Sequence, residues 1–166
     1  MAETTAVSVR KATVDDAEVI AALNEHVQAV HATLLPEIFK PVSAPTLTAA
    51  EARTFLEKAD TLALLATVGG EAVGYAYAEV RRRPESSFAF AHNEVYLHYI
   101  SVAEQSRRRG VGTALINALA QYGAGQGISR LVLDVWTVNE PARAFFRAHG
   151  FEPYNERLAR GGWGRV

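Results

Sequence analysis

Residues 105–114 read QSRRRGVGTA and join an expected central strand to an expected helix. The preceding residues 94–102, EVYLHYISV, are rich in β-branched and aromatic side chains, which favour a strand. In residues 110–122 the apolar side chains recur on one face, which predicts a helix. Glycines at such a junction let the backbone turn tightly and bring unpaired N–H groups, with the positive end of the helix, close to a ligand. The stretch therefore predicts an anion pocket.

Three consecutive arginines, Arg107 to Arg109, place full positive charges before this helix. Glu104 is the one acid in the loop, so the charges favour a di- or triphosphate over a single carboxylate. The alternative is a run of arginines that simply faces water. Charge alone does not exclude this alternative. Two other phosphate motifs do not fit, because the Walker lysine is missing and Leu115 stands where a dinucleotide-binding fold has its third glycine.

The rest of the chain alternates strand and helix patterns around this junction. We expect strands over 7–11, 62–68, 72–80, 94–102, 131–135 and 151–158, and helices over about 15–33, 48–58, 110–122 and 139–150. Gly69-Gly70 predicts a hairpin, and the arginine triplet 81–83, followed by Pro84, predicts a solvated turn. The order β-α-α-β-β-β-α-β-α-β predicts a mixed sheet covered by helices.

Composition narrows the class of protein. A chain of 166 residues with 49% hydrophobic and 21% charged residues fits one globular domain. The formal charge of -1 argues against nucleic acid as a partner. The absence of cysteine excludes disulfides, thiolate zinc sites and a cysteine nucleophile. We find no signal segment and no apolar run of about 18 residues, so we expect a cytoplasmic protein without a membrane partner.

A second block follows the first at Asn139, Ala142, Phe145-Phe146 and Gly150-Phe151. With Arg107-Arg108-Arg109-Gly110-Val111-Gly112, it resembles the GNAT superfamily of acetyl-CoA-dependent N-acetyltransferases, whose signature is a basic residue or glutamine, two positions, Gly, one position, then Gly or Ala. The resemblance covers residues 7 to about 158. It implies an α/β GNAT fold in one domain over 1–166: a mixed, mostly antiparallel central sheet flanked by helices, with a splayed strand at the CoA site.

The resemblance also implies how acetyl-CoA binds. The pyrophosphate would lie on the loop and helix start, the pantetheine arm would pair with the backbone of the strand, and Asn139 and the Phe146 region would contact the same arm. A backbone N–H near His98 would polarise the thioester carbonyl. The expected cofactor residues are Ile100, Ser101, Val102, Arg107, Arg108, Arg109, Gly110, Val111, Gly112, Thr113, Asn139 and Phe146.

Acetyl transfer needs a neutral amine, yet a free alkylamine with a pKa of about 10.4 is mostly charged at neutral pH. Glu94 matches the place of the catalytic glutamate in the histone-acetylating branch of the superfamily, so the resemblance makes it the first candidate for the general base. An ordinary carboxylate facing water is its alternative. His98 is the second candidate, because histidine titrates near neutral pH, and its alternative is a packed, hydrogen-bonded side chain.

One residue departs from the family pattern: Phe146 stands where the family usually has a tyrosine that protonates the departing thiolate. Tyr154, Tyr99 and Tyr96 are the possible replacements. The departure motivates a second hypothesis, a non-catalytic CoA-binding or regulatory module, and a nucleotide-binding domain is the third. His92 and His98 are too far apart along one strand to share a metal, so no metal site is expected. The acceptor would be a small-molecule or peptide amine, and a homodimer is possible.

Overall fold

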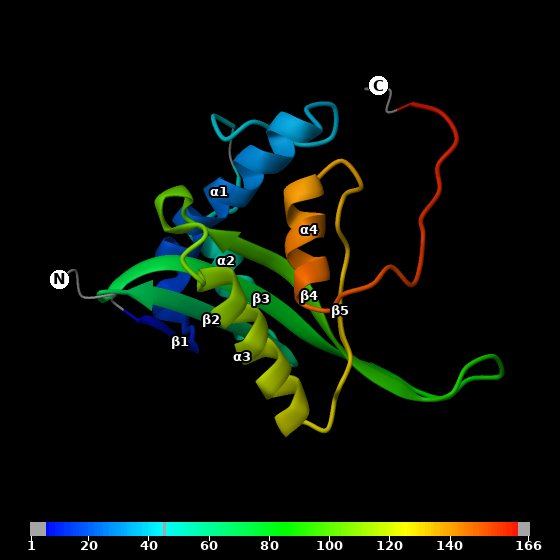
Figure 1. Cartoon of the computed structure of the whole chain (residues 1–166). Helices are drawn as coiled ribbons and strands as arrows, with labels where there is room; N and C mark the ends of the chain where they lie inside the picture. Colours follow the sequence, from blue (N-terminus) through cyan, green and yellow to red (C-terminus); the bar gives the residue numbers. More distant parts are fainter. Residues whose placement is uncertain (1–5, 45, 163–166) are drawn as a thin grey trace.

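One sheet runs through the molecule with its strands in sequence order, β1-β2-β3-β4-β5 (Figure 1). The computed structural model describes residues 6–44 and 46–162; residues 1–5, 163–166 and Pro45, which the expected domain includes, lie outside that part. The strands are β1 (Val7–Lys11), β2 (Thr61–Val68), β3 (Glu71–Arg83), β4 (His92–Val102) and β5 (Leu131–Leu133). The pairs β1–β2, β2–β3 and β3–β4 are antiparallel, and β5 runs parallel to β4. The mixed, mostly antiparallel sheet is confirmed.

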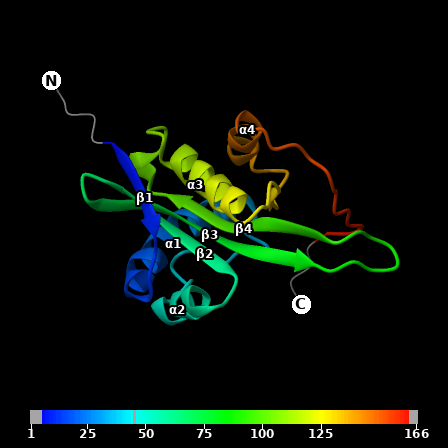
Figure 2. The same ribbon diagram turned by 90° about the horizontal axis from the view of Figure 1, so that it is seen from below.

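Helices cover both faces of this sheet (Figure 2). They are α1 (Ala17–Leu34), α2 (Ala49–Glu57), α3 (Val111–Gly125) and α4 (Glu140–Ala148). The face under α3 and α4 holds a core that includes Leu64, Leu97, Leu115 and Phe146. The opposite face, under α1 and α2, holds a second core that includes Tyr75. Burial of apolar surface on both faces stabilises the sheet as the middle layer.

Local sequence signals place several element ends as expected. Thr48 caps α2 by accepting a hydrogen bond from the Glu51 backbone N–H at 3.2 Å, while the Glu51 carboxylate reaches back to Thr48. Asn139 caps α4 by accepting from the Ala142 N–H, also at 3.2 Å. Gly69-Gly70 joins β2 to β3 in an antiparallel hairpin. These signals act within a few residues, which is why the sequence shows them.

The start of the first helix carries a compact ion pair. A short 3₁₀ turn, Val14–Asp16, precedes α1, and the Asp16 carboxylate accepts hydrogen bonds from Arg10 at 2.7 and 2.8 Å. The Thr13 backbone N–H donates to the same carboxylate at 2.8 Å. The Arg10 guanidinium, with Thr13, lowers the pKa of Asp16 to about 2. The pair ties the end of β1 to the start of α1.

The arginine triplet 81–83 is not the turn expected from sequence. It forms the end of β3, which pairs with β4 as far as Arg83 opposite His92. Cross-strand contacts stabilise the extension: the Arg81 guanidinium lies 3.4 Å from the centre of the Tyr96 ring, and Arg83 forms an ion pair with Glu94. Because these partners come from another strand, local charge misled the sequence argument.

The expected last strand over 151–158 is also wrong. Within the described part of the chain, these residues form no strand, and Figure 1 shows the segment running away from the sheet. Leu158 is 85% exposed. The neighbouring edge, β5, is three residues long, and Pro153 has no N–H to donate to a ladder. The element order alone therefore did not place this segment correctly.

Candidate active site

A cleft of about 1700 Å³ opens beside the C-terminal half of β4. It is lined by residues of α1, α2, β3, β4, the start of α3 and the segment from β5 to α4. His98 lines it, and so does every residue expected to bind the cofactor except Arg109. The fold therefore brings together two sequence blocks that are separated by about 30 residues.

The two strands beside the cleft diverge. β5 pairs with β4 only at Val95–Leu97, so Ile100 and Val102 lie beyond its end and pair with β3 alone. The expected splayed strand is thereby confirmed. The Ser101 hydroxyl donates to the Leu23 carbonyl of α1 at 2.6 Å, which fixes this part of β4 against the helix. The result is a firmly held strand whose outer backbone edge has no strand beside it in the described residues.

The loop after β4 turns sharply into α3. Arg108 and Gly110 both have left-handed backbone angles, with φ of 59° and 82°. Within the described residues, no side chain caps the N-terminus of α3 at Gly110. A Cβ atom on Gly112 would lie 2.9 Å from the Phe145 ring, so this glycine is needed for α4 to approach α3. The cleft thus ends in an uncapped helix start with a positive dipole end.

The arginines of this loop differ in position. Arg107 and Arg108 line the cleft, and the Arg107 Nε donates to the Val102 carbonyl at 3.3 Å. Arg109 is exposed and does not line it. Two guanidinium groups at an uncapped helix start can hold a diphosphate through charge-assisted hydrogen bonds. The charge run therefore has two members at the cleft and one outside it.

Asn139 and Phe146 lie at the α4 side of the cleft. Both are buried, and the Asn139 carbonyl oxygen is occupied as the helix cap. Phe146 packs between Phe145 and Phe151 at ring distances of 5.3 and 5.5 Å. Phe146 is therefore a core residue with one edge on the cleft, and it has no hydroxyl to offer a leaving group.

His98 lies at an irregularity in the sheet. Tyr77 pairs with Tyr99, but the next residue of β3, Ala78, pairs with Leu97, so His98 is an extra residue with no partner on β3. Its Nε2 lies 2.9 Å from the Glu79 Oε2. Such a bulge turns a side chain and its backbone out of the regular ladder. Here it places an imidazole on the cleft.

Glu79 is a site residue that sequence reasoning did not find. The hydrogen bond with His98, assisted by the nearby charges of Lys58 and Arg81, lowers the pKa of Glu79, so it is a carboxylate at neutral pH. A carboxylate only accepts, so His98 Nε2 is the donor of this hydrogen bond. The two residues lie 19 positions apart on different strands, and no motif links them.

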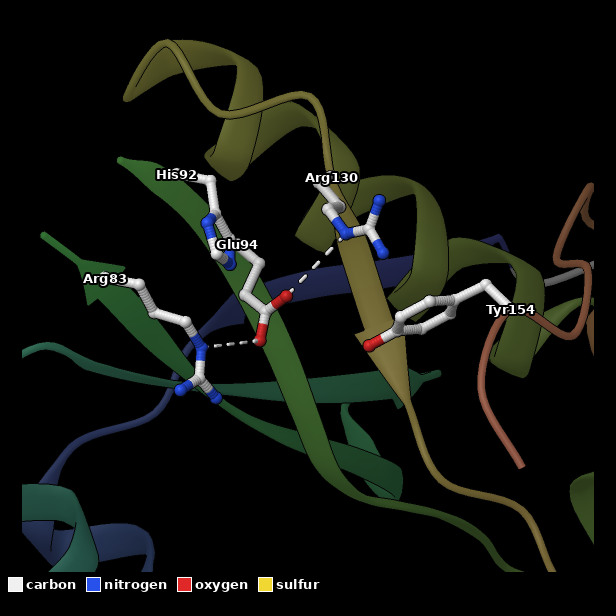
Figure 3. Close-up of a pocket in the computed structure, with 5 residues that line it drawn as sticks. All are labelled: Arg83, His92, Glu94, Arg130 and Tyr154. Atoms are coloured by element: carbon white, nitrogen blue, oxygen red, sulfur yellow. Dashed lines mark ion pairs between the residues drawn. The ribbon is translucent and has the colours of Figure 1, made fainter. Parts of the chain in front are cut away.

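Glu94 lies in a different place. It is 5% exposed and forms ion pairs with Arg83 at 3.9 Å and Arg130 at 3.7 Å. Figure 3 shows the two guanidinium groups approaching it from opposite sides, with the Tyr154 hydroxyl pointing toward the same space. These residues and His92 line a separate pocket of about 480 Å³. Glu94 does not line the large cleft, and its expected role as the general base stays a prediction.

Two of the three tyrosines named as replacements for the missing acid line the cleft. The Tyr96 hydroxyl donates to Asp134 at 2.6 Å; burial, with this bond, raises its pKa to about 12. Tyr99 is partly exposed at the cleft, whereas Tyr154 lies over Arg130 at the other pocket. In the part of the chain that the structure describes, no cluster of three metal-binding side chains occurs. No described helix is long and apolar enough to cross a bilayer.

Comparisons with known proteins agree with this geometry. The family model described as Acetyltransferase (GNAT) family matches residues 27–151. N-acetyltransferase family 8 member 3 of Mus musculus is 29% identical over 104 residues, which are 63% of this chain and 44% of that protein. The chain spans about half the length of the curated relatives it matches.

Solved structures share the fold. A tetramutant of the BH1408 protein from Bacillus halodurans superposes with a TM-score of 0.88 at 23% identity, over 93% of this chain and 99% of that one. The aminoglycoside N-acetyltransferase AAC(6')-Iy, solved in complex with CoA, superposes with a TM-score of 0.68 at 21% identity, over 98% of both chains. At these identities the likeness establishes the fold alone.

Proposed function

Because the chain belongs to the GNAT family of acetyltransferases, we propose that it transfers the acetyl group of acetyl-CoA to a primary amine, which attacks directly within a ternary complex. One observation carries the proposal. The open edge of β4, the uncapped start of α3 and His98, whose Nε2 is hydrogen-bonded to Glu79, all border one cleft. A cofactor and an acceptor bound there would meet at His98.

The residues of the cleft fit acetyl-CoA. The α3 N-terminus, with Arg107 and Arg108, would hold the diphosphate, since backbone N–H groups and guanidinium groups are its best partners. The backbone of Ile100 and Val102, beyond the end of β5, would pair with the amide groups of the pantetheine arm. Asn139 and Phe146 would border that arm. Acetyl-CoA supplies an activated thioester carbonyl, and the chain supplies position and proton transfer.

His98 would act as the general base. Its Nε2–H is bonded to Glu79, so Nδ1 is the atom that can accept a proton from the acceptor amine. Glu79 would act as a positioning residue, because it holds the ring and favours the imidazolium that forms. As the amine nitrogen bonds to the carbonyl carbon, the carbon–sulfur bond breaks and CoA leaves as a thiolate, which takes up the second proton that the nitrogen loses. The thiol pKa of CoA, about 8.5, makes that departure feasible without a hydroxyl at Phe146.

The backbone N–H at the bulge would stabilise the oxygen of the thioester carbonyl. His98 lacks a register partner on β3 and lies beyond the last residue that pairs with β5. An N–H left outside the ladder is a fixed donor for the negative charge that develops on the oxygen. Removing one such donor in other enzymes costs about 10²–10³ in rate.

The test is release of free thiol from acetyl-CoA in the presence of a panel of primary amines. We expect amine-dependent turnover, and we expect calorimetry to record acetyl-CoA binding that Arg107→Ala weakens. Binding with no turnover on any amine would favour the non-catalytic CoA-binding module. Absence of both binding and turnover would overturn the proposal. Phe88→Ala is the matched control, because Phe88 is fully exposed in the β3–β4 loop, away from the cleft.

A further inference from the structure

A row of four rings lines the cleft and includes His98, the proposed base. Phe55 lies 4.2 Å from Tyr77, Tyr77 lies 5.2 Å from His98, and His98 lies 4.9 Å from Tyr96, measured between ring centres. All four residues line the same cleft. We call them the ring row. Aromatic faces bind other aromatic groups and cations, with a gain beyond simple burial.

A second aromatic group lines the same cleft. Phe39 stacks on His31 at 4.7 Å and meets Trp136 edge-on at 5.6 Å. The loop after α1 therefore contacts the segment after β5. Burial lowers the pKa of His31, which favours its neutral ring. The apolar side chains of Val42 and Leu47 also line the cleft.

Three carboxylates lie close to the ring row. Glu79 is bonded to His98, and Asp134 accepts the Tyr96 hydroxyl. Glu51 lies one helical turn before Phe55 on α2 and accepts two hydrogen bonds from Thr48. Glu79 and Asp134 are the two carboxylates bonded to rings of the row. Of these two, Asp134 is the exposed one. It is placed to attract an ammonium group toward His98.

Two cations offset these carboxylates. Lys58 lies 3.8 Å and Arg81 lies 3.6 Å from Glu79, and the Arg81 guanidinium also covers the Tyr96 ring. Neither cation lines the cleft, whereas Glu25, Glu51 and Asp134 do, so the cleft presents carboxylates to a cationic group.

We propose that the acceptor is a primary amine whose amino group is carried on a short arm from an aromatic ring. The inference rests on the proposed function and names its acceptor. The aromatic group would stack on Phe55, which is only partly buried, whereas Tyr77 is buried behind it. The ammonium group would bind Asp134 before it loses a proton to His98. An aliphatic amine without a ring is a poorer acceptor on this account.

The experiment compares acceptors of matched amine chemistry. 2-Phenylethylamine and butylamine carry the same primary amino group, with and without a ring. We expect kcat/KM for 2-phenylethylamine to exceed that for butylamine by about 10-fold or more. Equal values for the two monoamines would overturn the assignment.

Two variants locate the effect. Phe55→Leu keeps an apolar side chain on α2 but removes a ring, so KM for 2-phenylethylamine should rise about 5- to 10-fold. The KM values for butylamine and acetyl-CoA should stay unchanged, which a damaged fold would not allow. Asp134→Asn should raise KM for both monoamines. An equal change for both monoamines in Phe55→Leu contradicts stacking on this ring.

Failure of the proposed function can be distinguished from failure of the acceptor assignment. If no amine is acetylated, calorimetric titration of 2-phenylethylamine and butylamine into the protein still tests the ring row. Tighter binding of 2-phenylethylamine, weakened by Phe55→Leu and unaffected by Phe88→Ala, supports the acceptor assignment. Equal or undetectable binding of both amines rejects it.

Discussion

The two halves of β4 carry similar residue types in opposite surroundings. Near His92, the Glu94 carboxylate is buried between Arg83 and Arg130, and it borders a pocket apart from the cleft. Four residues along, about 13 Å at strand spacing, His98 projects from a bulge into the cleft and is held by one carboxylate. A titratable side chain on a central strand becomes a candidate base only where its partners leave an atom open to substrate.

The largest expected difference is between these two candidate bases. His98→Gln should lower kcat by about 10²–10³, because it removes the atom that accepts the proton. Glu94→Gln should change kcat by about 3-fold or less, since Glu94 does not line the cleft. Steady-state kinetics at saturating acetyl-CoA, with circular dichroism to confirm folding, compare the two. A large loss of kcat in Glu94→Gln with an intact fold would restore it as the base.

Glu79→Gln tests the contrast between two carboxylates. Glu79 is proposed to position His98, whereas Glu94 is held by two arginines. The amide keeps a hydrogen bond to His98 but removes the charge that favours the imidazolium, so kcat should fall about 10- to 50-fold. KM for acetyl-CoA should hardly change. Glu79→Asp should recover part of the rate. A fall in stability with an unchanged rate and pH profile would show that Glu79 is merely structural.

Arginines divide in the same way, between those that border the cleft and those that do not. Arg107→Ala should raise KM for acetyl-CoA about 5- to 10-fold, the cost of one charge-assisted contact. Arg109→Ala, an identical substitution two residues on, should leave it within about 2-fold. Initial rates over a range of acetyl-CoA concentrations measure both. Equal effects would mean that the triplet acts as a diffuse charge rather than through placed side chains.

The smallest expected effect is on the free energy of unfolding. It concerns the ion pair between Asp16 and Arg10. The pKa of Asp16, lowered by Arg10 to about 2, makes the pair stabilising above pH 4 and progressively less so as the pH falls toward 2. Asp16→Asn should cost about 1 to 2 kcal/mol at pH 7, given the exposed Arg10, and almost nothing at pH 2. Urea unfolding at both pH values checks this. A pH-independent difference would point to packing instead.

Much of the fold follows from short-range signals. The Thr48 and Asn139 caps, the Gly69-Gly70 hairpin and the strand over 94–102 depend on neighbours within a few residues. The errors share one cause. Residues 81–83 become strand because β4 supplies partners, and residues 151–158 remain outside the sheet because the edge of β5 is short. Pairing with a distant segment overrode local preference in the first case, and the lack of such pairing did so in the second.

The residue types of the cofactor site were determined by the sequence itself. The order strand, arginine loop, glycine, helix is covalent, so an anion pocket at Arg107 to Thr113 follows from the chain wherever that junction folds. Tertiary structure alone decided which titratable side chains lie at the cleft and which lie away from it. The bulge that turns out His98, the register that brings Glu79 to it and the pairing that withdraws Glu94 arise from contacts between strands. One strand's sequence does not encode its neighbour's register, so these choices exist only once the sheet has formed.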